Sequence, residues 1–270
     1  MVNFDTLIIN PLINILMIVY QLLSFIKIPY ALGFSIIGLT IIVRLILYPL
    51  MNSQLKASKK MQEMNPHLKK IKDKHKNDAK MLQQETMRLY KEHGVNPAAG
   101  CLPVIVQLPI IWGLYSVLQK IVLLKPVDIN KVLYFDSLKL TNPWDTLFFG
   151  LPLAQSPSQL IEKIGPFVFL VPLLTGLFQY IQSKMMFVKN KEEKENVKEK
   201  KQEDFATAFQ SQSMYLFPLM IGFFSYSFSI GLSLYWNTFT IFGIIQQYKI
   251  SGLGGLEEWK NKIWQKKVIK

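Results

Sequence analysis

The stretch IPYALGFSIIGLTIIVRLILYPLM, residues 28–51, is an apolar run of 24 residues that carries one charge, Arg44. A helix of about 20 residues, rising roughly 1.5 Å per residue, crosses the ~30 Å hydrocarbon core of a bilayer. A guanidinium inside such a helix costs about 2.5–3.5 kcal/mol on insertion scales, and arginine does not lose its proton to avoid that cost. The run therefore predicts a membrane span whose arginine faces water, a partner or a polar cavity.

The composition predicts a polytopic membrane protein built as one helical bundle. Half of the residues are hydrophobic and only 18% are charged, whereas soluble chains have about 25% charged residues. The single cysteine, Cys101, excludes an intramolecular disulfide framework and a cysteine-rich metal site. We expect no cleavable signal peptide, because Asp5 stands where a cationic start would be and no small-residue cleavage site follows.

Three further apolar stretches extend the bundle to five spans. Residues 100–119 and 165–183 carry no charge, and neither do the 44 residues from 205 to 248. The last stretch is too long for one span of about 20 residues. It predicts two helices, 209–228 and 232–249, joined by a turn at 229–231.

The N-terminal stretch, residues 1–27, is also apolar but has a polar stripe. Residues at steps of three and four lie on one side of a helix; here these are Asn3, Thr6, Asn10, Asn14, Met17, Gln21 and Ser24. All but Met17 are polar, which is typical of an amphipathic helix lying in the membrane interface. A sixth span remains the alternative.

The orientation follows from the basic residues between the spans. Residues 52–99 carry eleven Lys and Arg residues, 189–211 carry six, and the tail 249–270 carries six. Residues 125–165 carry four, matched by four acids. Because basic loops stay in the cytoplasm, the N-terminus is expected outside and the C-terminus inside. The net charge of +13 then needs no nucleic acid to explain it.

Within residues 52–99 a heptad-like seam predicts an antiparallel cytoplasmic helical hairpin. Met61, Met64, Leu68 and Ile71 step by three and four, and Gly94 is a helix stop. The complete predicted organisation is an N-terminal interfacial helix at 1–27, spans at 28–51, 100–124, 165–188, 209–228 and 232–249, the hairpin at 52–99, an extracytoplasmic segment at 125–164, a cytoplasmic linker at 189–208 and a basic cytoplasmic tail at 250–270.

The chain lacks the residues that enzymes of the membrane use. All three histidines fall in the predicted hairpin, and no glycine is followed by lysine, so a phosphate-binding P-loop is absent. No HExxH or GxSxG sequence and no pair of intramembrane carboxylates occurs. The sequence therefore predicts no enzyme, no metal and no cofactor.

Polar residues of separate spans fall at matched depths instead. Arg44 and Gln107 each lie seven residues from the cytoplasmic end of their span, about 10 Å into the bilayer. Thr40 shares a helix face with Arg44, and Trp236 lies above both. This pattern predicts a wet recess in the inner leaflet, closed from above by Trp236. Alternatively, Arg44 snorkels to the headgroups, Gln107 bonds a neighbouring helix and Trp236 belongs to an interfacial belt.

Three motifs in order resemble the YidC family of membrane protein insertases. IIVRLILYPL, followed by MNSQLKASKKMQEMNPHLKKIKDKHKND, is similar to the family's first span and hairpin. RLYKEHGVNPAAGCLPVIVQLPIIWGLY and GLSLYWNTFTIFGIIQQ resemble the next signature and the last-span signature. The likeness covers nearly the whole chain and fits the small bacterial form that lacks the large extracytoplasmic domain.

The resemblance implies a helper protein that guides single-span and small membrane proteins into the bacterial cell membrane, without nucleotide hydrolysis. Its fold would be five transmembrane helices around a hydrophilic groove that is open to the cytoplasm and closed outside. Arg44 matches the arginine thought to attract acidic substrate segments, Gln107 the groove-lining glutamine and Trp236 the aromatic at the upper end. Thr240 departs from the family, which usually has asparagine there, and we expect it to tune helix packing.

The implied partners are nascent membrane proteins and the lipid bilayer, with the ribosome and the Sec translocon as further candidates. We assign recruitment to the hairpin lysines, which are Lys59, Lys60, Lys69 and Lys70. A monomer suffices for a laterally open groove. The sequence leaves two other functions open: a small-solute or ion channel built on the same recess, and a passive assembly chaperone.

Overall fold

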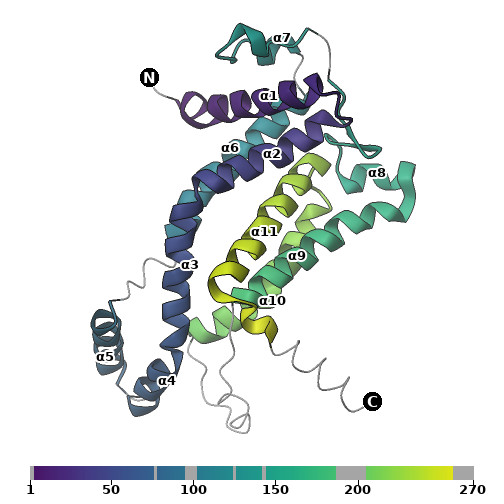
Figure 1. The fold of residues 1–270 in the computed structure, drawn as a ribbon. Helices are drawn as coiled ribbons and strands as arrows, with labels where there is room; N and C mark the ends of the chain where they lie inside the picture. Colours follow the sequence, from purple (N-terminus) through teal and green to yellow (C-terminus); the bar gives the residue numbers. More distant parts are fainter. Residues whose placement is uncertain are drawn as a thin grey trace. The chain divides into compact units, whose positions relative to one another are not determined.

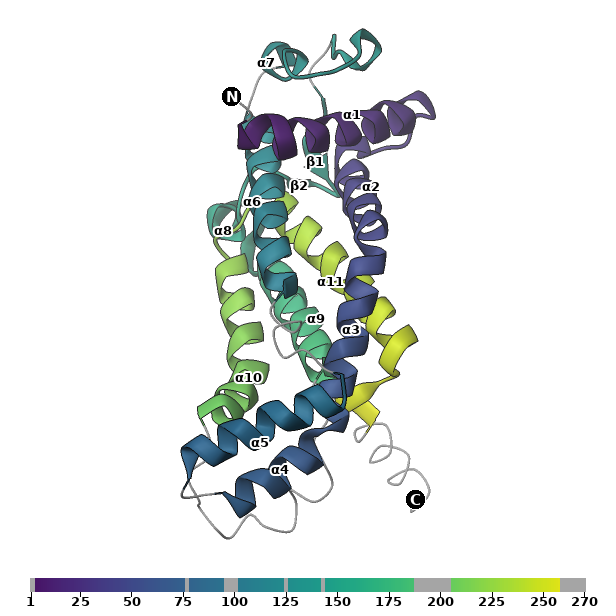
Figure 2. The same ribbon diagram turned by 90° about the vertical axis from the view of Figure 1, so that its left-hand side faces the viewer.

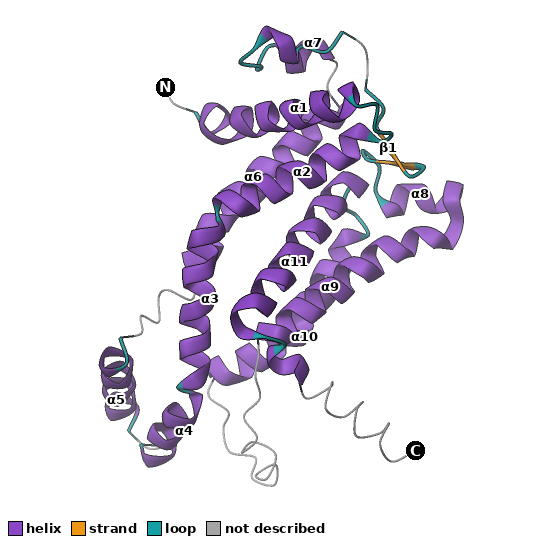
Figure 3. Cartoon of the chain, viewed as in Figure 1, coloured by secondary structure: helices purple, strands orange, loops and turns teal. Residues whose placement is uncertain are grey.

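The computed structural model describes residues 3–75, 78–94, 102–123, 126–141, 144–186 and 205–257, and these are mostly helical (Figure 3). The chain forms two compact units. The first comprises residues 1–47, 105–179 and 217–242, and the second comprises 48–104, 180–216 and 243–270. Several helices therefore contribute to both units.

The elements follow one another along the chain as coloured in Figure 1. The helices are α1 (Asn10–Phe25), α2 (Ala31–Ile46), α3 (Tyr48–Glu63), α4 (Asn65–Lys74), α5 (Ala79–Glu92), α6 (Leu102–Leu123), α7 (Pro126–Asn130), α8 (Pro157–Ile164), α9 (Leu170–Met186), α10 (Phe205–Ser225) and α11 (Ile230–Ser251). A π-helical turn, Asp5–Ile9, precedes α1, and β1 (Leu147–Phe148) pairs antiparallel with β2 (Leu151–Pro152).

In the first unit, α1 lies across the ends of α2 and α6 (Figure 2). Two glycines permit this close crossing. A Cβ atom on Gly38 of α2 would lie 2.9 Å from Val19, and one on Gly113 of α6 would lie 2.6 Å from Ile8. The buried apolar core of the unit includes Leu16 of α1, extends along α2 to Val43 and reaches Tyr235 of α11. The helix α1 is therefore part of this core.

An amphipathic helix in the membrane interface would expose its whole polar stripe to solvent. In α1, part of that stripe is buried. Asn14 is only 3% exposed. Its Nδ2 donates to the Val132 carbonyl at 3.0 Å, and its Oδ1 accepts from the Tyr134 backbone N–H at 2.8 Å. Met17, on the same stripe, is fully buried. The segment that follows α7 thus covers this part of the polar stripe, and its backbone groups find hydrogen-bond partners in Asn14.

Within the predicted span 28–51 the helix is interrupted. The helix α2 begins after Tyr30 and ends at Ile46, and Leu47 interrupts the helix before α3 starts. Pro49 explains the interruption, because proline has no backbone N–H and its ring clashes with the carbonyl of the residue four positions earlier.

The apolar stretch 205–248 is divided into two helices, with the break at residues 226–229 rather than at 229–231. At the level of this break α9 and α10 cross closely, since the Cα atom of Gly176 lies 3.3 Å from an ideal Cβ on Gly222. A buried hydroxyl chain joins α9, α10 and α11: Ser225 Oγ lies 3.2 Å from Thr175 Oγ1 and 3.1 Å from Ser233 Oγ. These interhelical bonds satisfy groups that lipid would leave unpaired.

In the second unit, α4 and α5 form the described part of the predicted hairpin. Asp78 caps α5 by accepting a hydrogen bond from the Met81 backbone N–H at 2.9 Å. Gly94 follows α5 with a φ of 62°, the left-handed conformation predicted for a helix stop. Most of the linker 189–208, most of the tail 250–270 and the start of the span at 100–124 lie outside the described residues.

Among the described residues, two helical stretches are long and apolar enough to cross a membrane, Asp5–Phe25 and Pro157–Met186. A third is added if Ala31–Ile46 and Tyr48–Met61 count as one interrupted span. The N-terminal stretch thus meets the length and composition of a span, although its sequence pattern favours the interface.

Candidate functional site

Arg44, in the last turn of α2, is buried to 1% exposure and points at α11. Its Nη2 donates to the backbone carbonyl of Phe239 at 2.6 Å. The guanidinium carbon lies 3.4 Å from the centre of the Phe239 ring and 5.9 Å from that of Phe242. One helix therefore supplies both a carbonyl and an aromatic surface to the cation.

An aromatic face of α11 forms this surface. Tyr235, Phe239 and Phe242 are spaced by four and three residues, so they lie on one side of the helix. The rings of Tyr235 and Phe239 are 5.8 Å apart. Aromatic faces attract cations through their quadrupole, worth about 2 kcal/mol or more when desolvated.

No carboxylate among the described residues forms an ion pair with Arg44, and its Nε makes no hydrogen bond to them. A buried charge without a counter-ion is destabilising by several kcal/mol. A ring and one carbonyl offset part of that cost. The site is thus a buried cation whose Nε has no hydrogen-bond partner among the described residues, which suits a visiting carboxylate.

The prediction that Arg44 faces an open, water-filled recess is not met in this conformation. Phe239, which comes from a segment 195 residues further along the chain, occupies the position where water was expected. The physical reason is that an aromatic ring also stabilises a buried cation, so the cation of Arg44 does not require water or a polar side chain.

The two threonines of the predicted site differ from each other. Thr40 is buried, and its hydroxyl donates to the Ile36 carbonyl of its own helix at 2.7 Å, so it offers no free donor. Thr240 is equally buried, but its Oγ1 has no hydrogen-bond partner in the described part of the chain. Thr240 follows Phe239 directly in α11.

Trp236 is half-buried, and its indole N–H donates to Oε1 of Gln179 at 3.2 Å. This bond joins α11 to α9, a link that the sequence did not reveal. Gln107 lies in α6, and its side chain is outside the described residues, so its predicted place beside Arg44 stays a prediction.

The hairpin lysines belong to the second unit. Lys59, Lys60 and Lys70 are exposed, and the side chain of Lys69 is not described. In the described residues, no group of three or more His, Cys, Asp or Glu side chains is placed to hold a metal ion.

Comparison with known proteins decides the family. The profile of the 60Kd inner membrane protein family matches residues 23–253. A membrane protein insertase YidC from Fusobacterium nucleatum is 35% identical over 222 residues, which cover 82% of this chain and 87% of that protein. The chain belongs to the YidC family of membrane protein insertases. The resemblance seen in the three sequence motifs is thereby confirmed.

Other YidC-family members support the assignment. The membrane protein insertase MisCA of Bacillus subtilis is 32% identical over 224 residues, covering 82% of this chain and 70% of that protein. The crystal structure of an active YidC insertase has the same fold, with a TM-score of 0.56 and 24% identity over 91% of this chain. The chain spans about half the length of that solved protein, 46%.

Proposed function

We propose that this YidC-family insertase binds acidic segments of nascent membrane proteins at Arg44 and guides them across the inner leaflet. In this proposal five spans enclose a groove open to the cytoplasm, lined by Arg44, Gln107, Thr240 and Trp236. The substrate's apolar helix then leaves sideways into lipid, driven by hydrophobic transfer. The step uses no nucleotide and no enzymatic chemistry.

The observation that carries the proposal is the incomplete pairing of Arg44. The guanidinium is buried against Phe239 and leaves Nε without a partner in the described residues. A carboxylate entering from the substrate would replace the ring, form charge-assisted hydrogen bonds and lose less solvation at this site than in lipid. The resting geometry is then the closed state of the groove.

The proposed orientation places the N-terminus outside and the C-terminus in the cytoplasm. Two features of the first unit support it together with the distribution of Lys and Arg. The helix α1 crosses α2 and α6 (Figure 2), which fits a helix in the outer interface. The helix α1 also buries Leu12, Leu16 and Met17 in the apolar core of that unit, which fits a groove closed outside.

The proposed partners are nascent membrane proteins and the bilayer, with the ribosome and the Sec translocon as further candidates and no specific nucleic acid. The exposed Lys59, Lys60 and Lys70 support recruitment through the cytoplasmic hairpin, and Lys69 is proposed to share that role. One chain forms the whole groove, so a monomer suffices.

Replacing Arg44 tests the proposal. We expect Arg44→Ala to abolish insertion of a single-span substrate with an acidic outer segment, whereas Arg44→Lys keeps part of the activity because it keeps the charge but not the planar donor geometry. The measurement is protease protection of the substrate after insertion into proteoliposomes that contain each variant.

A substrate with a neutral outer segment serves as the control, and we expect the variants to insert it almost normally. Normal insertion of the acidic substrate by Arg44→Ala, in protein that is folded and reconstituted at equal density, would contradict the attraction mechanism.

A further inference from the structure

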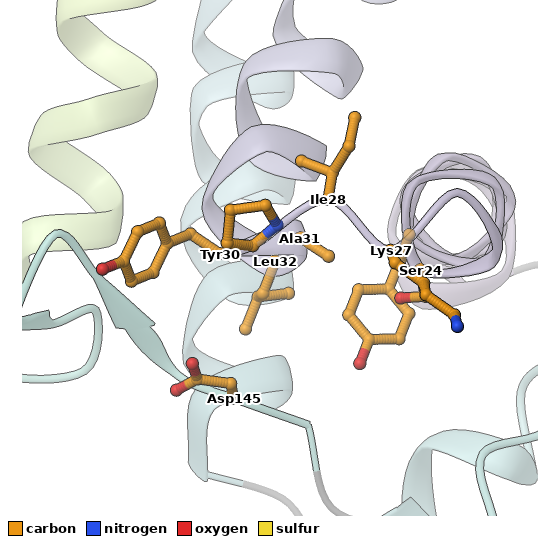
Figure 4. A pocket seen from close by; sticks show the side chains of 9 residues that line it. Ser24, Lys27, Ile28, Tyr30, Ala31, Leu32 and Asp145 are labelled. Carbon is orange, nitrogen blue, oxygen red and sulfur yellow. The ribbon is translucent and has the colours of Figure 1, made fainter.

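A pocket of about 310 Å³ lies at the turn between α1 and α2 (Figure 4), and Arg44 is not among the residues that line it. Tyr20, Ser24 and Lys27 line it from the α1 side, Tyr30 and Leu32 from the α2 side, and Asp145 from the segment before β1. Pockets of this size accept small polar groups. The pocket takes no part in the proposed path of the substrate.

Two charges of opposite sign face this pocket from different elements. In Figure 4 Asp145 lies across the pocket from Ser24 and Lys27. The Asp145 carboxylate accepts a hydrogen bond from the Leu147 backbone N–H at 2.9 Å. The described residues form no ion pair with either charge. A cation and an anion held apart at the rim of one pocket fit a ligand that carries both signs.

The backbone of the turn is held in an unusual conformation. Lys27 and Tyr30 have φ values of 56° and 57°, in the left-handed region that side chains rarely adopt. The centre of the Tyr30 ring lies 4.9 Å from that of Phe149 and 6.2 Å from that of Phe148, both of the short β1–β2 hairpin. Strain of this kind persists where the surroundings fix it, often at ligand sites.

The residues next to Lys27 are apolar and exposed. Leu22, Phe25 and Ile26 are 61%, 85% and 55% exposed. In a protein of the membrane such side chains contact acyl chains, so lipid lies directly beside the pocket. A headgroup whose phosphate is adjacent to the acyl chains would meet Lys27 first.

We infer that this pocket binds the headgroup of phosphatidylethanolamine, with the phosphate at Lys27 and the ammonium at Asp145. The ammonium donates hydrogen bonds to the carboxylate, which the quaternary amine of phosphatidylcholine does not do. Phosphatidylglycerol carries the phosphate but no cation for Asp145. The lipid fastens the α1–α2 turn to one leaflet, which is the outer leaflet in the proposed orientation.

Lipid retention by the full-length protein tests the inference. The protein is released from nanodiscs that contain equal amounts of phosphatidylethanolamine, phosphatidylglycerol and phosphatidylcholine, and the retained lipids are counted by native mass spectrometry. We expect phosphatidylethanolamine to be retained preferentially. Asp145→Asn should lower that preference about two- to fivefold, as expected for losing one exposed charge pair. Lys27→Gln should instead lower the retention of all three lipids, because all three carry the phosphate.

Asparagine at position 145 can still accept the hydrogen bond from Leu147, so Asp145→Asn keeps the local fold. Glu162→Gln and Lys163→Gln, both exposed on α8, are the matched controls and should leave the preference unchanged. Asp145→Asn should leave retention of phosphatidylglycerol unchanged, whereas Lys27→Gln should lower it.

Three results would overturn the inference. They are equal retention of the three lipids, an equal effect of the control variants, and displacement of the lipid by soluble glycerophosphoethanolamine at comparable concentration. The last result would identify a water-soluble phosphate ester as the ligand.

Discussion

At Arg44 an aromatic ring competes with the carboxylate that the proposed substrate brings. A desolvated cation over an aromatic face gains about 2 kcal/mol or more. Two unit charges 4 Å apart gain about 4 kcal/mol at the effective dielectric constant typical near protein surfaces. We propose that the carboxylate displaces Phe239, because this gain and its hydrogen bonds to the guanidinium together exceed the cation–π energy and the cost of removing the carboxylate from water. In this proposal the ring returns once the substrate has left and keeps the cation from facing lipid.

Phe239→Leu tests the resting geometry. Leucine keeps an apolar side chain but removes the quadrupole, so we expect the free energy of unfolding to fall by about 1–2 kcal/mol. In a double-mutant cycle with Arg44→Met, about 0.5–2 kcal/mol should appear as coupling between the two residues. The measurement is reversible denaturant unfolding in micelles.

Phe242→Leu is the matched control, because that ring centre lies 5.9 Å from the guanidinium rather than 3.4 Å. Its coupling with Arg44 should be the smaller of the two. Equal couplings would mean that the cation–π contact of Phe239 has no special role.

The importance of Arg44 could be predicted from the sequence because a lone charge in an apolar run is costly wherever it lies. Its partner could not be predicted, since Phe239 is distant in the chain and phenylalanine is an ordinary residue of a span. The spacing of Tyr235, Phe239 and Phe242 was a usable signal. Only the fold brings that aromatic face to Arg44.

Among the elements, α1 depends on the segment around Val132 for its polar side. Asn14 bonds both the Val132 carbonyl and the Tyr134 N–H, and leaving such buried backbone groups unpaired costs about 1–3 kcal/mol each. This segment therefore holds the side of α1 that lipid would not accept.

We predict that Asn14→Leu loosens residues 131–135 without unfolding the bundle. Hydrogen–deuterium exchange at the Tyr134 amide should become faster by about tenfold or more, as expected when roughly 1.4 kcal/mol of local stability is lost. Peptide-resolved mass spectrometry of the reconstituted protein measures it.

Gln21→Leu is the control for that experiment, since Gln21 makes one long hydrogen bond of 3.4 Å to the Leu138 carbonyl. It should change exchange near Leu138 only slightly. Unchanged exchange at Tyr134 in Asn14→Leu would show that other contacts hold the segment.

Helix locations could be predicted from apolar length, and the division of residues 205–248 into two helices is an example. Helix ends could not be predicted as well. Pro49 lies within a continuous apolar run, so hydrophobicity alone did not indicate that the helix is interrupted at Leu47. The buried hydroxyl chain of Thr175, Ser225 and Ser233 joins three helices, and spacing along one chain does not reveal it.

For the whole molecule, charge and apolar length together define the arrangement in the membrane. The cytoplasmic segments are proposed to hold most of the excess positive charge, and the apolar core of the first unit is proposed to face outside. The distribution of charge could be read from the sequence, whereas the contact of Arg44 with Phe239 required the fold.

Cysteine labelling tests this orientation. In a Cys101→Ser background, Ser137→Cys should react with a membrane-impermeant maleimide added outside intact cells. Lys59→Cys should react only after the cells are opened, because the hairpin is proposed to lie in the cytoplasm. The reverse pattern would contradict the N-out, C-in arrangement.

The central claim, that Arg44 attracts acidic substrate segments, is tested most directly by reversing the charge at position 44 and in the substrate. Arg44→Glu is reconstituted with a single-span substrate whose outer segment carries either acidic residues or lysines in their place, and protease-protected substrate is measured. Attraction at Arg44 predicts that the variant fails with the acidic substrate and inserts the lysine substrate better than the wild-type protein does. If the variant inserted both substrates equally, or neither one while remaining folded, Arg44 would not act as the receptor for substrate charge.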